Sequence, residues 1–442
     1  MSNDELPTPP YGKSFLAKWC FVRDLWQGVR QHLISRRFWK NSGLLMLANV
    51  VVMILGLARV PIVTRVLTKD EVGMLGVVAS ALPFLQLLSL PGLDGAAYHY
   101  VAKGHPKALL TNISTRLRWS ILSTLGFLFG GIYWLLRGNS TLAGLFTIAA
   151  LTYPMTTGLT AVAGFLSARE DFGRLFWYRI AEALTRYGGF TILLLLPSLS
   201  GRVLWFSLGG NVALAVLQIY VASWLVLRVR NSKELFMPPE EEREVLRYGR
   251  HLTVMSGIST ARTQMDTLIV GWFLPLGVVA DYSIAQLVHG QLKRLWAIYY
   301  YVRYPSFVRL APYQRRRRMV FEAIAVWIGF IVLGVIAALG LWTFIPIILP
   351  PEYNSSLPFI GWFLIAFAAG VPGYFVDMYF RTQQDERNQY RLLGATAVSG
   401  IVLPVLCVLL WQARAIVWGR VAASVAFSAL GIILFALDRD GE

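Results

Sequence analysis

The chain has 442 residues, of which 56% are hydrophobic and only 15% are charged, and its formal net charge is +17. Soluble globular proteins carry about 25% charged residues, so this composition excludes a chain folded as soluble domains, and its apolar content excludes intrinsic disorder. The apolar residues recur in runs of about 20, the length of a helix that crosses a hydrocarbon core about 30 Å thick. We therefore predict an all-α polytopic membrane protein.

Residues 1–42 are basic and lack the apolar core of about 7–15 residues that a cleavable signal peptide requires. Phe15, Trp19, Val22 and Trp26 form an apolar stripe at helical spacing, with basic residues between them. This pattern predicts a helix that lies on the cytoplasmic face of the membrane. The composition alone would also fit a disordered basic tail.

Apolar runs between charge clusters predict twelve transmembrane helices. Their ranges are 43–64, 72–93, 119–136, 141–165, 180–197, 203–227, 251–273, 279–302, 319–348, 357–380, 392–411 and 415–436.

The distribution of cations predicts the orientation of these helices. With the N-terminus inside, the inner segments hold 30 Lys and Arg residues and the outer segments hold 5. Basic residues accumulate in cytoplasmic loops, so we expect both termini of this multi-pass protein in the cytoplasm. The excess also predicts contacts with anionic lipids at the inner surface, and no nucleic-acid partner is indicated.

The sequence offers no signal for catalysis. The outer connections are too short to hold acid and base groups against a substrate, and no GxxxxGK[ST] phosphate cradle is present. Cys20 and Cys407 lie far apart and outside any metal-ligand pattern. We expect no enzyme activity, no metal site and no cofactor, which leaves transport as the functional class.

The predicted helices divide into two lobes of six. The N-lobe covers 43–227 and the C-lobe 251–436, with a cytoplasmic connection at 228–250 and a cytoplasmic tail at 437–442. The halves have nearly equal lengths and begin on the same side of the membrane. These features predict a duplication related by a pseudo-two-fold axis along the membrane normal.

Several stretches of the membrane part carry a family resemblance through their order and spacing. They are 65–73 (RVLTKDEVG), 90–96 (LPGLDGA), 248–250 (YGR), 264–271 (QMDTLIVG) and 279–285 (VADYSIA). Together they resemble the polysaccharide transporter, or O-antigen flippase-like, branch of the multidrug/oligosaccharidyl-lipid/polysaccharide (MOP) exporter superfamily. The resemblance implies two six-helix lobes that form a V around a central cavity. It also implies that undecaprenyl-pyrophosphate-linked oligosaccharides move from the inner to the outer leaflet by alternating access.

Ionisable residues inside the predicted spans are the candidate functional residues, because a charge in hydrocarbon costs at least about 2.5–3.5 kcal/mol. Cations outnumber anions there, which predicts a net-positive cavity that suits a lipid pyrophosphate better than a cationic drug. The candidate substrate-binding cations are Arg59, Arg186, Arg262, Lys293 and Arg294.

Some of these cations have a second interpretation. Glu182, four residues before Arg186, would neutralise it. Lys293 and, less strongly, Arg294 would snorkel to the cytoplasmic interface. Arg420 lies near the predicted outer end of its span and is expected at the interface.

Arg59 and Asp266 occupy equivalent positions in a weak internal repeat with an offset of 207 residues. We hypothesise that they approach each other across the lobes in the inward-open state and close an outer gate. The equally weighted alternative is that Asp266 pairs with Arg262 one turn earlier.

Asp377 is the candidate coupling residue. It follows 370–373 (GVPG), where we expect a break in the tenth span, and a carboxylate beside a broken helix can hold Na⁺ or a proton. An ordinary ion pair with Arg381, one turn later, is at least as consistent with the sequence.

The resemblance and the intramembrane cations together imply a lipid-linked oligosaccharide flippase of the bacterial inner membrane with a cationic central cavity. Its expected partners are the lipid-pyrophosphate-linked glycan, a polysaccharide polymerase and glycosyltransferases, and the protein itself is expected to be a monomer. The alternatives are a cation-coupled multidrug exporter of the same superfamily and a non-transporting membrane subunit of a polysaccharide biosynthesis complex.

Overall fold

The computed structural model describes residues 36–188, 201–230, 237–308, 310, 312–383, 385–411 and 415–438, and the regular elements in these ranges are all helices joined by short connections. The elements of the first half are α2 (Arg36–Val66), α3 (Lys69–Leu87), α4 (Gly92–Ala102), α5 (Lys107–Leu136), α6 (Ser140–Gly158), α7 (Ala161–Ala168), α8 (Phe172–Ala183), the π-helical turn η1 (Leu184–Gly188) and α10 (Arg202–Arg230). Those of the second half are α11 (Pro239–Phe273), α12 (Leu276–Val308), α13 (Pro312–Ile348), the 3₁₀ turn η2 (Pro351–Ser356), α14 (Leu357–Gln383), α15 (Glu386–Trp411) and α16 (Ile416–Leu437). Most of the predicted N-terminal segment, residues 1–35, and the last four residues lie outside the described ranges.

The predicted all-helical membrane architecture is confirmed. Nine of the described helical segments are long and apolar enough to cross a membrane. Each predicted span falls on a helix or a pair of helices, although the fifth continues into residues 189–200, outside the described ranges. Helices α11 and α12 are too polar to meet the same criterion, and both pack against other helices in the middle of the molecule.

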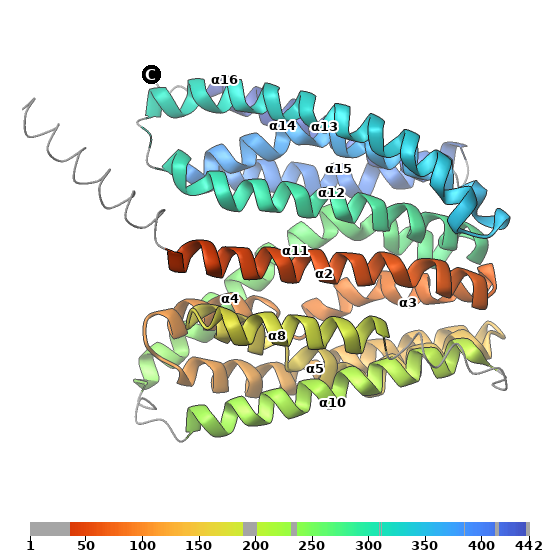
Figure 1. The fold of residues 1–442 in the computed structure, drawn as a ribbon, viewed down its shortest axis with the longest axis horizontal. Helices are drawn as coiled ribbons and strands as arrows, with labels where there is room; N and C mark the ends of the chain where they lie inside the picture. The colour runs from red at the N-terminus through yellow and green to blue at the C-terminus, as the bar shows by residue number, and fades with distance from the viewer. Residues whose placement is uncertain are drawn as a thin grey trace, which may run out of the picture.

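The helices form two groups, one above the other in Figure 1. In the first group α5 and α10 pack against α6, and α2 packs against α8. In the second group α14 and α15 pack against α16, and α13 packs against α14. Helix α11 crosses between the groups and contacts α3 and α4 on one side and α15 on the other.

Apolar side chains cover the outside of the molecule as well as its core. Helix α13 shows this most clearly, because none of its best membrane-spanning window is buried within the protein. Phe321 and Leu339 are among its exposed large side chains. Such a surface is stable only where lipid surrounds it, so the chain is a multi-pass membrane protein.

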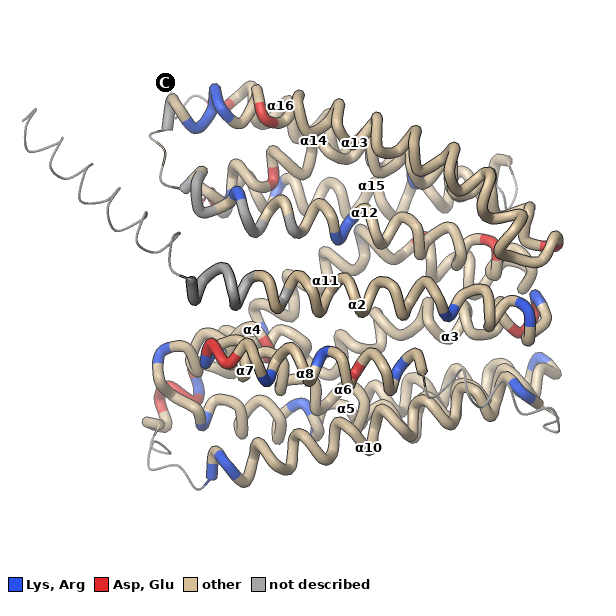
Figure 2. Tube along the Cα trace, in the orientation of Figure 1, with Lys and Arg blue, Asp and Glu red and all other residues tan. Residues whose placement is uncertain are grey.

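Charged residues are frequent at the two ends of the helices, and others lie along the middle of the bundle (Figure 2). Helix α3 begins at one of these ends with a capping box, in which Thr68 accepts from the Glu71 backbone and Glu71 accepts from the Thr68 backbone. This satisfies backbone groups that a helix N-terminus otherwise leaves unpaired.

Two predicted spans are broken within the first half. The second span consists of α3 and α4, separated at 88–91, where Leu90 has a positive φ of 56° and Pro91 follows. The fourth consists of α6 and α7, separated at 159–160. Hydroxyl groups bond carbonyls beside both breaks, since Ser123 donates to the Leu85 carbonyl and Thr160 to the Thr157 carbonyl. Breaks inside a membrane protein persist only where such partners are present.

The predicted polar connection at 228–250 is partly helical. Residues 239–250 form the first turns of α11, which continues without interruption to Phe273. Val245 is fully buried in a hydrophobic cluster with residues of α4, α5 and α7. Helix α11 therefore begins in the core of the first half and ends in the second half.

Candidate functional site

The two halves meet along a seam formed by α3 and α4 on one side and by α11 and α12 on the other. Glycines allow the backbones to approach closely, because a Cβ atom on Gly73 would overlap the Leu276 carbonyl and one on Gly92 would overlap the Thr253 backbone. The Gly92 amide also donates to the Thr253 hydroxyl at 3.0 Å. The seam is thus closely packed in this structure, and polar clusters lie at both of its ends.

At one end, Lys69 at the start of α3 reaches across to the second half. Its Nζ donates to the Asp281 carboxylate at 2.9 Å, to the Ser355 hydroxyl at 2.7 Å and to the Glu352 carbonyl at 2.8 Å. The Asp281 side chain is only 6% exposed, so the lysine compensates an otherwise buried charge. We call Lys69, Asp281, Ser355 and the Glu352 carbonyl the Lys69 cluster.

At the other end, the first turns of α11 carry carboxylates that face basic and hydroxyl groups of the first half. Glu242 accepts from the Thr111 hydroxyl at 2.9 Å and lies 3.6 Å from Lys107 Nζ, while Glu241 lies 3.4 Å from His105 Nε2. We call these five residues the Glu242 cluster. Its ionisable side chains are each about one-third exposed, so individual pairs contribute little.

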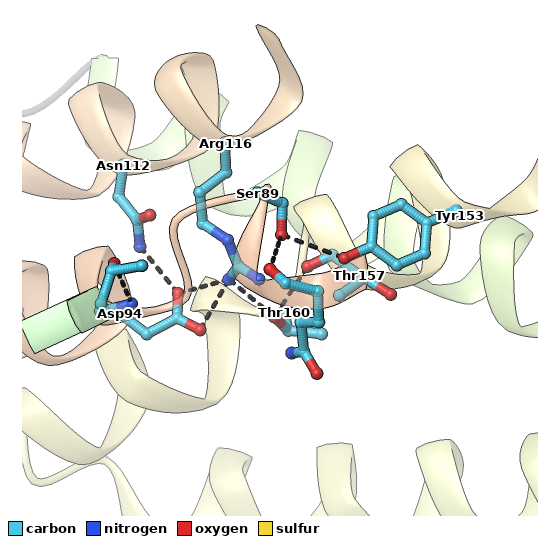
Figure 3. A network of polar contacts seen from close by, with 10 residues as sticks. Ser89, Asp94, Asn112, Arg116, Tyr153, Thr157 and Thr160 are labelled. Carbon is cyan, nitrogen blue, oxygen red and sulfur yellow. Dashed lines mark hydrogen bonds and ion pairs between the residues drawn. The ribbon is translucent and has the colours of Figure 1, made fainter. Parts of the chain in front are cut away.

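An ion pair between a buried arginine and a partly exposed aspartate lies inside the first half, where its two broken spans meet (Figure 3). Arg116 of α5 is fully buried and donates to both carboxylate oxygens of Asp94 at 2.6 Å and to the Thr160 hydroxyl at 2.9 Å. Asn112 donates to the same carboxylate at 3.0 Å. The Arg116 guanidinium therefore joins α4 to the break between α6 and α7. Its partner Asp94 lies on α4 two residues after Gly92, which makes the seam contact.

The structure does not bring Arg59 and Asp266 together. Asp266 is buried, accepts from the Tyr282 hydroxyl and lies 3.3 Å from Arg420 Nη1. Arg420 also donates to the Thr263 carbonyl at 3.1 Å. The expectation that Arg420 lies at the membrane interface is therefore wrong, because its side chain is only 9% exposed and compensates a buried carboxylate.

The two predicted cations of the first half lie against their own half. The half-buried Arg59 has its guanidinium over the rings of Phe206 and Tyr187, at 5.0 and 5.9 Å. Arg186 pairs with Glu182 at 3.1 Å, which is the neutralising contact that the sequence offered as an alternative.

The candidate cations of the second half lie on α11 and α12. Lys293 is half-buried, and Arg294 is exposed and donates to Gln291 at 3.2 Å. The side chain of Arg262 lies outside the described part of the structure. Two hollows, one between α4 and α11 and an apolar one beside Trp272, have no predicted cation in their lining.

The expected break before Asp377 is absent, since α14 continues through Pro372 to Gln383. Proline leaves the carbonyl four residues earlier without its helical donor, and the indole of Trp327 donates to that Ala368 carbonyl at 2.9 Å. The Ser428 hydroxyl accepts from the Gly373 amide and donates to the next carbonyl, that of Ala369. Side chains of neighbouring helices therefore satisfy the backbone groups that Pro372 leaves unpaired, and α14 stays continuous. Asp377 forms a local ion pair with Arg381 at 3.0 Å.

Sequence reasoning missed the residues that join the halves. Lys69 and Asp281 lie in two of the stretches that carry the family resemblance, 65–73 and 279–285. The predicted spans place Lys69 in a loop and Asp281 inside a helix, and neither position suggests that the two residues pair. Arg116, which pairs inside the first half, precedes the third predicted span (119–136), so the sequence places it in a cytoplasmic loop. A signal was present for Lys69 and Asp281, because opposite charges lie near the start of the second predicted span in each half, Lys69 just before 72–93 and Asp281 just inside 279–302. In the described part of the chain, no group of three or more His, Cys, Asp or Glu residues could hold a metal ion.

Comparisons with known proteins identify both a family and a fold. A family model described as "Polysaccharide biosynthesis protein" matches residues 38–311, more than half of the chain. No curated protein sequence matches. Among solved structures, the chain is similar to an inward-facing multidrug resistance MATE family transporter of the MOP superfamily, with a TM-score of 0.61 and 11% identity over 87% of this chain and 95% of the other.

The chain is also similar to the lipid II flippase MurJ in an inward closed conformation, with a TM-score of 0.56 and 12% identity over 89% of this chain and 87% of the other. A third similar structure is the eukaryotic MATE transporter AtDTX14, with a TM-score of 0.55 and 15% identity over 90% and 93% of the two chains. At these identities the likeness establishes the fold alone.

Proposed function

Because the chain belongs to the polysaccharide biosynthesis protein family and has the fold of MOP transporters, we propose that it moves a lipid-linked oligosaccharide between membrane leaflets by alternating access. The family and fold are those of transporters, and the chain is not an enzyme. The proposed substrate is an undecaprenyl-pyrophosphate-linked glycan, and the proposed location is the bacterial inner membrane. We further propose twelve spans in two six-helix lobes, with the Lys69 cluster at the outer end and the Glu242 cluster at the cytoplasmic end.

The observation that carries the proposal is the seam that joins the halves at both ends through compact polar clusters. Alternating access requires that each end can open while the other stays closed. Hydrogen bonds and ion pairs at the ends of a seam are suited to this, because water can replace them when an end opens. Lys69 at one end and Glu242 at the other each contact several partners.

The charges of the interior favour an anionic headgroup over a cationic drug. Asp94, Asp266 and Asp281 each lie against an arginine or a lysine, so these carboxylates are already compensated. We propose that, in an open state, Arg59, Arg186, Lys293 and Arg294 border the path of the pyrophosphate, where guanidinium groups can bind phosphate oxygens in pairs. We also propose that Arg262 binds the substrate and that Asp377 holds the coupling ion.

Reconstitution into vesicles tests the function directly. Fluorescently labelled lipid-linked oligosaccharide from the native host would be placed in proteoliposomes, and its appearance in the opposite leaflet would be followed by a membrane-impermeant quencher. We expect movement with the wild type and strongly reduced movement with the double variant Arg59→Ala, Arg294→Ala. Efflux of a cationic dye without glycan movement would instead identify a drug exporter. Movement of neither under any ion gradient would favour a non-transporting subunit.

A further inference from the structure

A hollow of about 510 Å³ lies across the seam beside the Glu242 cluster. Two of its lining residues, His99 and Tyr100, belong to α4 of the first half, and four, Glu244, Arg247, Tyr248 and His251, belong to α11. Its volume is within the range of about 300–1,000 Å³ that is typical of small-molecule sites. We call these six residues the seam pocket, and the transport path proposed above uses none of them.

The lining combines hydrogen-bonding groups of both kinds. Glu244 offers carboxylate oxygens and is held by the Tyr100 hydroxyl, which donates to it at 2.9 Å, and by Arg247 Nη2 at 3.7 Å. Burial, together with this bond to Glu244, raises the pKa of Tyr100 above its ordinary value, so the phenol stays a donor at neutral pH. The imidazoles of His99 and His251 can each donate or accept.

Aromatic faces complete the pocket. Tyr248 is 42% exposed, and the ring of His99 meets it edge-on at 6.1 Å. The Tyr390 hydroxyl lies 3.4 Å from His251 Nε2, which links the far wall to α15. An exposed phenol ring supplies apolar contact area with a polar tip at low conformational cost.

This chemistry selects among ligands. A carboxylate and a guanidinium in one pocket give no net formal charge when the histidines are neutral, so a strongly anionic ligand would meet repulsion from Glu244. A purely apolar ligand would leave the charged groups unsatisfied. Sugar rings fit both requirements, because their hydroxyls donate and accept while their apolar faces can lie on an aromatic ring.

We propose that the seam pocket is a carbohydrate site that binds one or two sugar rings of the glycan headgroup. This assignment rests on the proposed function, which supplies the glycan. Because one wall belongs to α4 and the other to the first turns of α11, a ligand that contacts both binds only while these two helices are packed together. The site therefore recognises the glycan at this end of the seam, and it contributes to substrate selection separately from contacts to the pyrophosphate.

Binding of free sugar tests the assignment without transport. The full-length protein in lipid nanodiscs would be titrated with the oligosaccharide released by mild acid from the host's lipid-linked glycan, and binding would be followed by saturation-transfer NMR. We expect Tyr248→Leu to weaken binding at least about tenfold, which corresponds to about 1.4 kcal/mol, and Glu244→Gln to weaken it as well. Tyr98→Leu is the matched control, since Tyr98 is an exposed tyrosine of α4 outside the pocket, and it should leave binding unchanged.

Equal sugar binding by the wild type and Tyr248→Leu would overturn the assignment, and so would displacement of the sugar by inorganic pyrophosphate. The leaflet assay separates this result from the proposed function. Glycan movement without Tyr248-dependent sugar binding contradicts the pocket alone. Tyr248-dependent sugar binding without glycan movement contradicts the flippase and leaves the pocket as a carbohydrate site. Failure of both assays rejects both proposals.

Discussion

The two ends of the seam are joined in different ways. At one end a single lysine makes three polar contacts with the second half, and its carboxylate partner is almost fully buried. At the other end several partly exposed pairs share the task. A buried pair becomes costly when one partner is removed, whereas exposed pairs contribute about 0–1 kcal/mol each. The Lys69 end should therefore open or close as a unit, and the Glu242 end should loosen gradually.

The largest change should come from the core beneath the Glu242 end. Arg116→Met removes the guanidinium that joins α4 to the break between α6 and α7, and it leaves the Asp94 carboxylate without its cation. We expect the free energy of unfolding to fall by about 2–3 kcal/mol, because the change removes charge-assisted hydrogen bonds, and reversible unfolding in mixed micelles would measure it. Arg118→Met, at an exposed position two residues later, should change it little. Equal losses in the two variants would show that the pair of Arg116 with Asp94 has no special role.

Lys69→Met should have the next largest effect, on conformation more than on stability. The change leaves Asp281 buried and without its cation, which disfavours the closed Lys69 end by about 1–3 kcal/mol. Spin labels at Ser140 and Asn354, exposed positions at this end of the two halves, should report a population with longer distances.

The neighbouring exposed residue provides the control for Lys69→Met, because Asp70→Asn should leave the distance distribution as in the wild type. The charge exchange Lys69→Asp with Asp281→Lys should restore part of the short-distance population. If the exchange restores nothing and Lys69→Met keeps the wild-type distances, the Lys69 cluster does not hold this end closed.

Glu242→Gln should have the smallest effect. The amide still accepts from Thr111 and loses only the attraction to Lys107, whose side chain is 34% exposed, so we expect a change below about 1 kcal/mol. Spin labels at Ala102 and Arg387, one in each half, would measure the opening of this end. An opening as large as that of Lys69→Met would contradict the contrast between the two ends.

The helices were predictable because each must be long and apolar enough to cross a bilayer, a property that the local sequence carries. Continuity within a helix was not predictable in the same way. The expected break in α14 is repaired by Trp327 and Ser428 of other helices. By contrast, the chain is interrupted at Leu90 and Pro91, and Ser123 of α5 donates to the nearby Leu85 carbonyl.

The candidate site was harder to predict than the fold. Charge and position identified Asp266 as a buried residue in need of a partner, but that partner, Arg420, lies 154 residues later and in the same half. Arg116 seemed to belong to a loop because cations are costly in a membrane. Its compensation by Asp94 depends on how α4, α5 and α7 pack. Pairing between distant segments is a property of the packed molecule, and no local pattern encodes it.

Helix α11 has a mechanical consequence. It is one uninterrupted rod of 35 residues, about 52 Å long, with its first turns embedded in one half and the remainder in the other. A tilt of about 10° around its midpoint would swing its tips by about 4–5 Å in opposite directions. Such a lever would couple separation at one extremity to compression at the other without any relay of side chains between them.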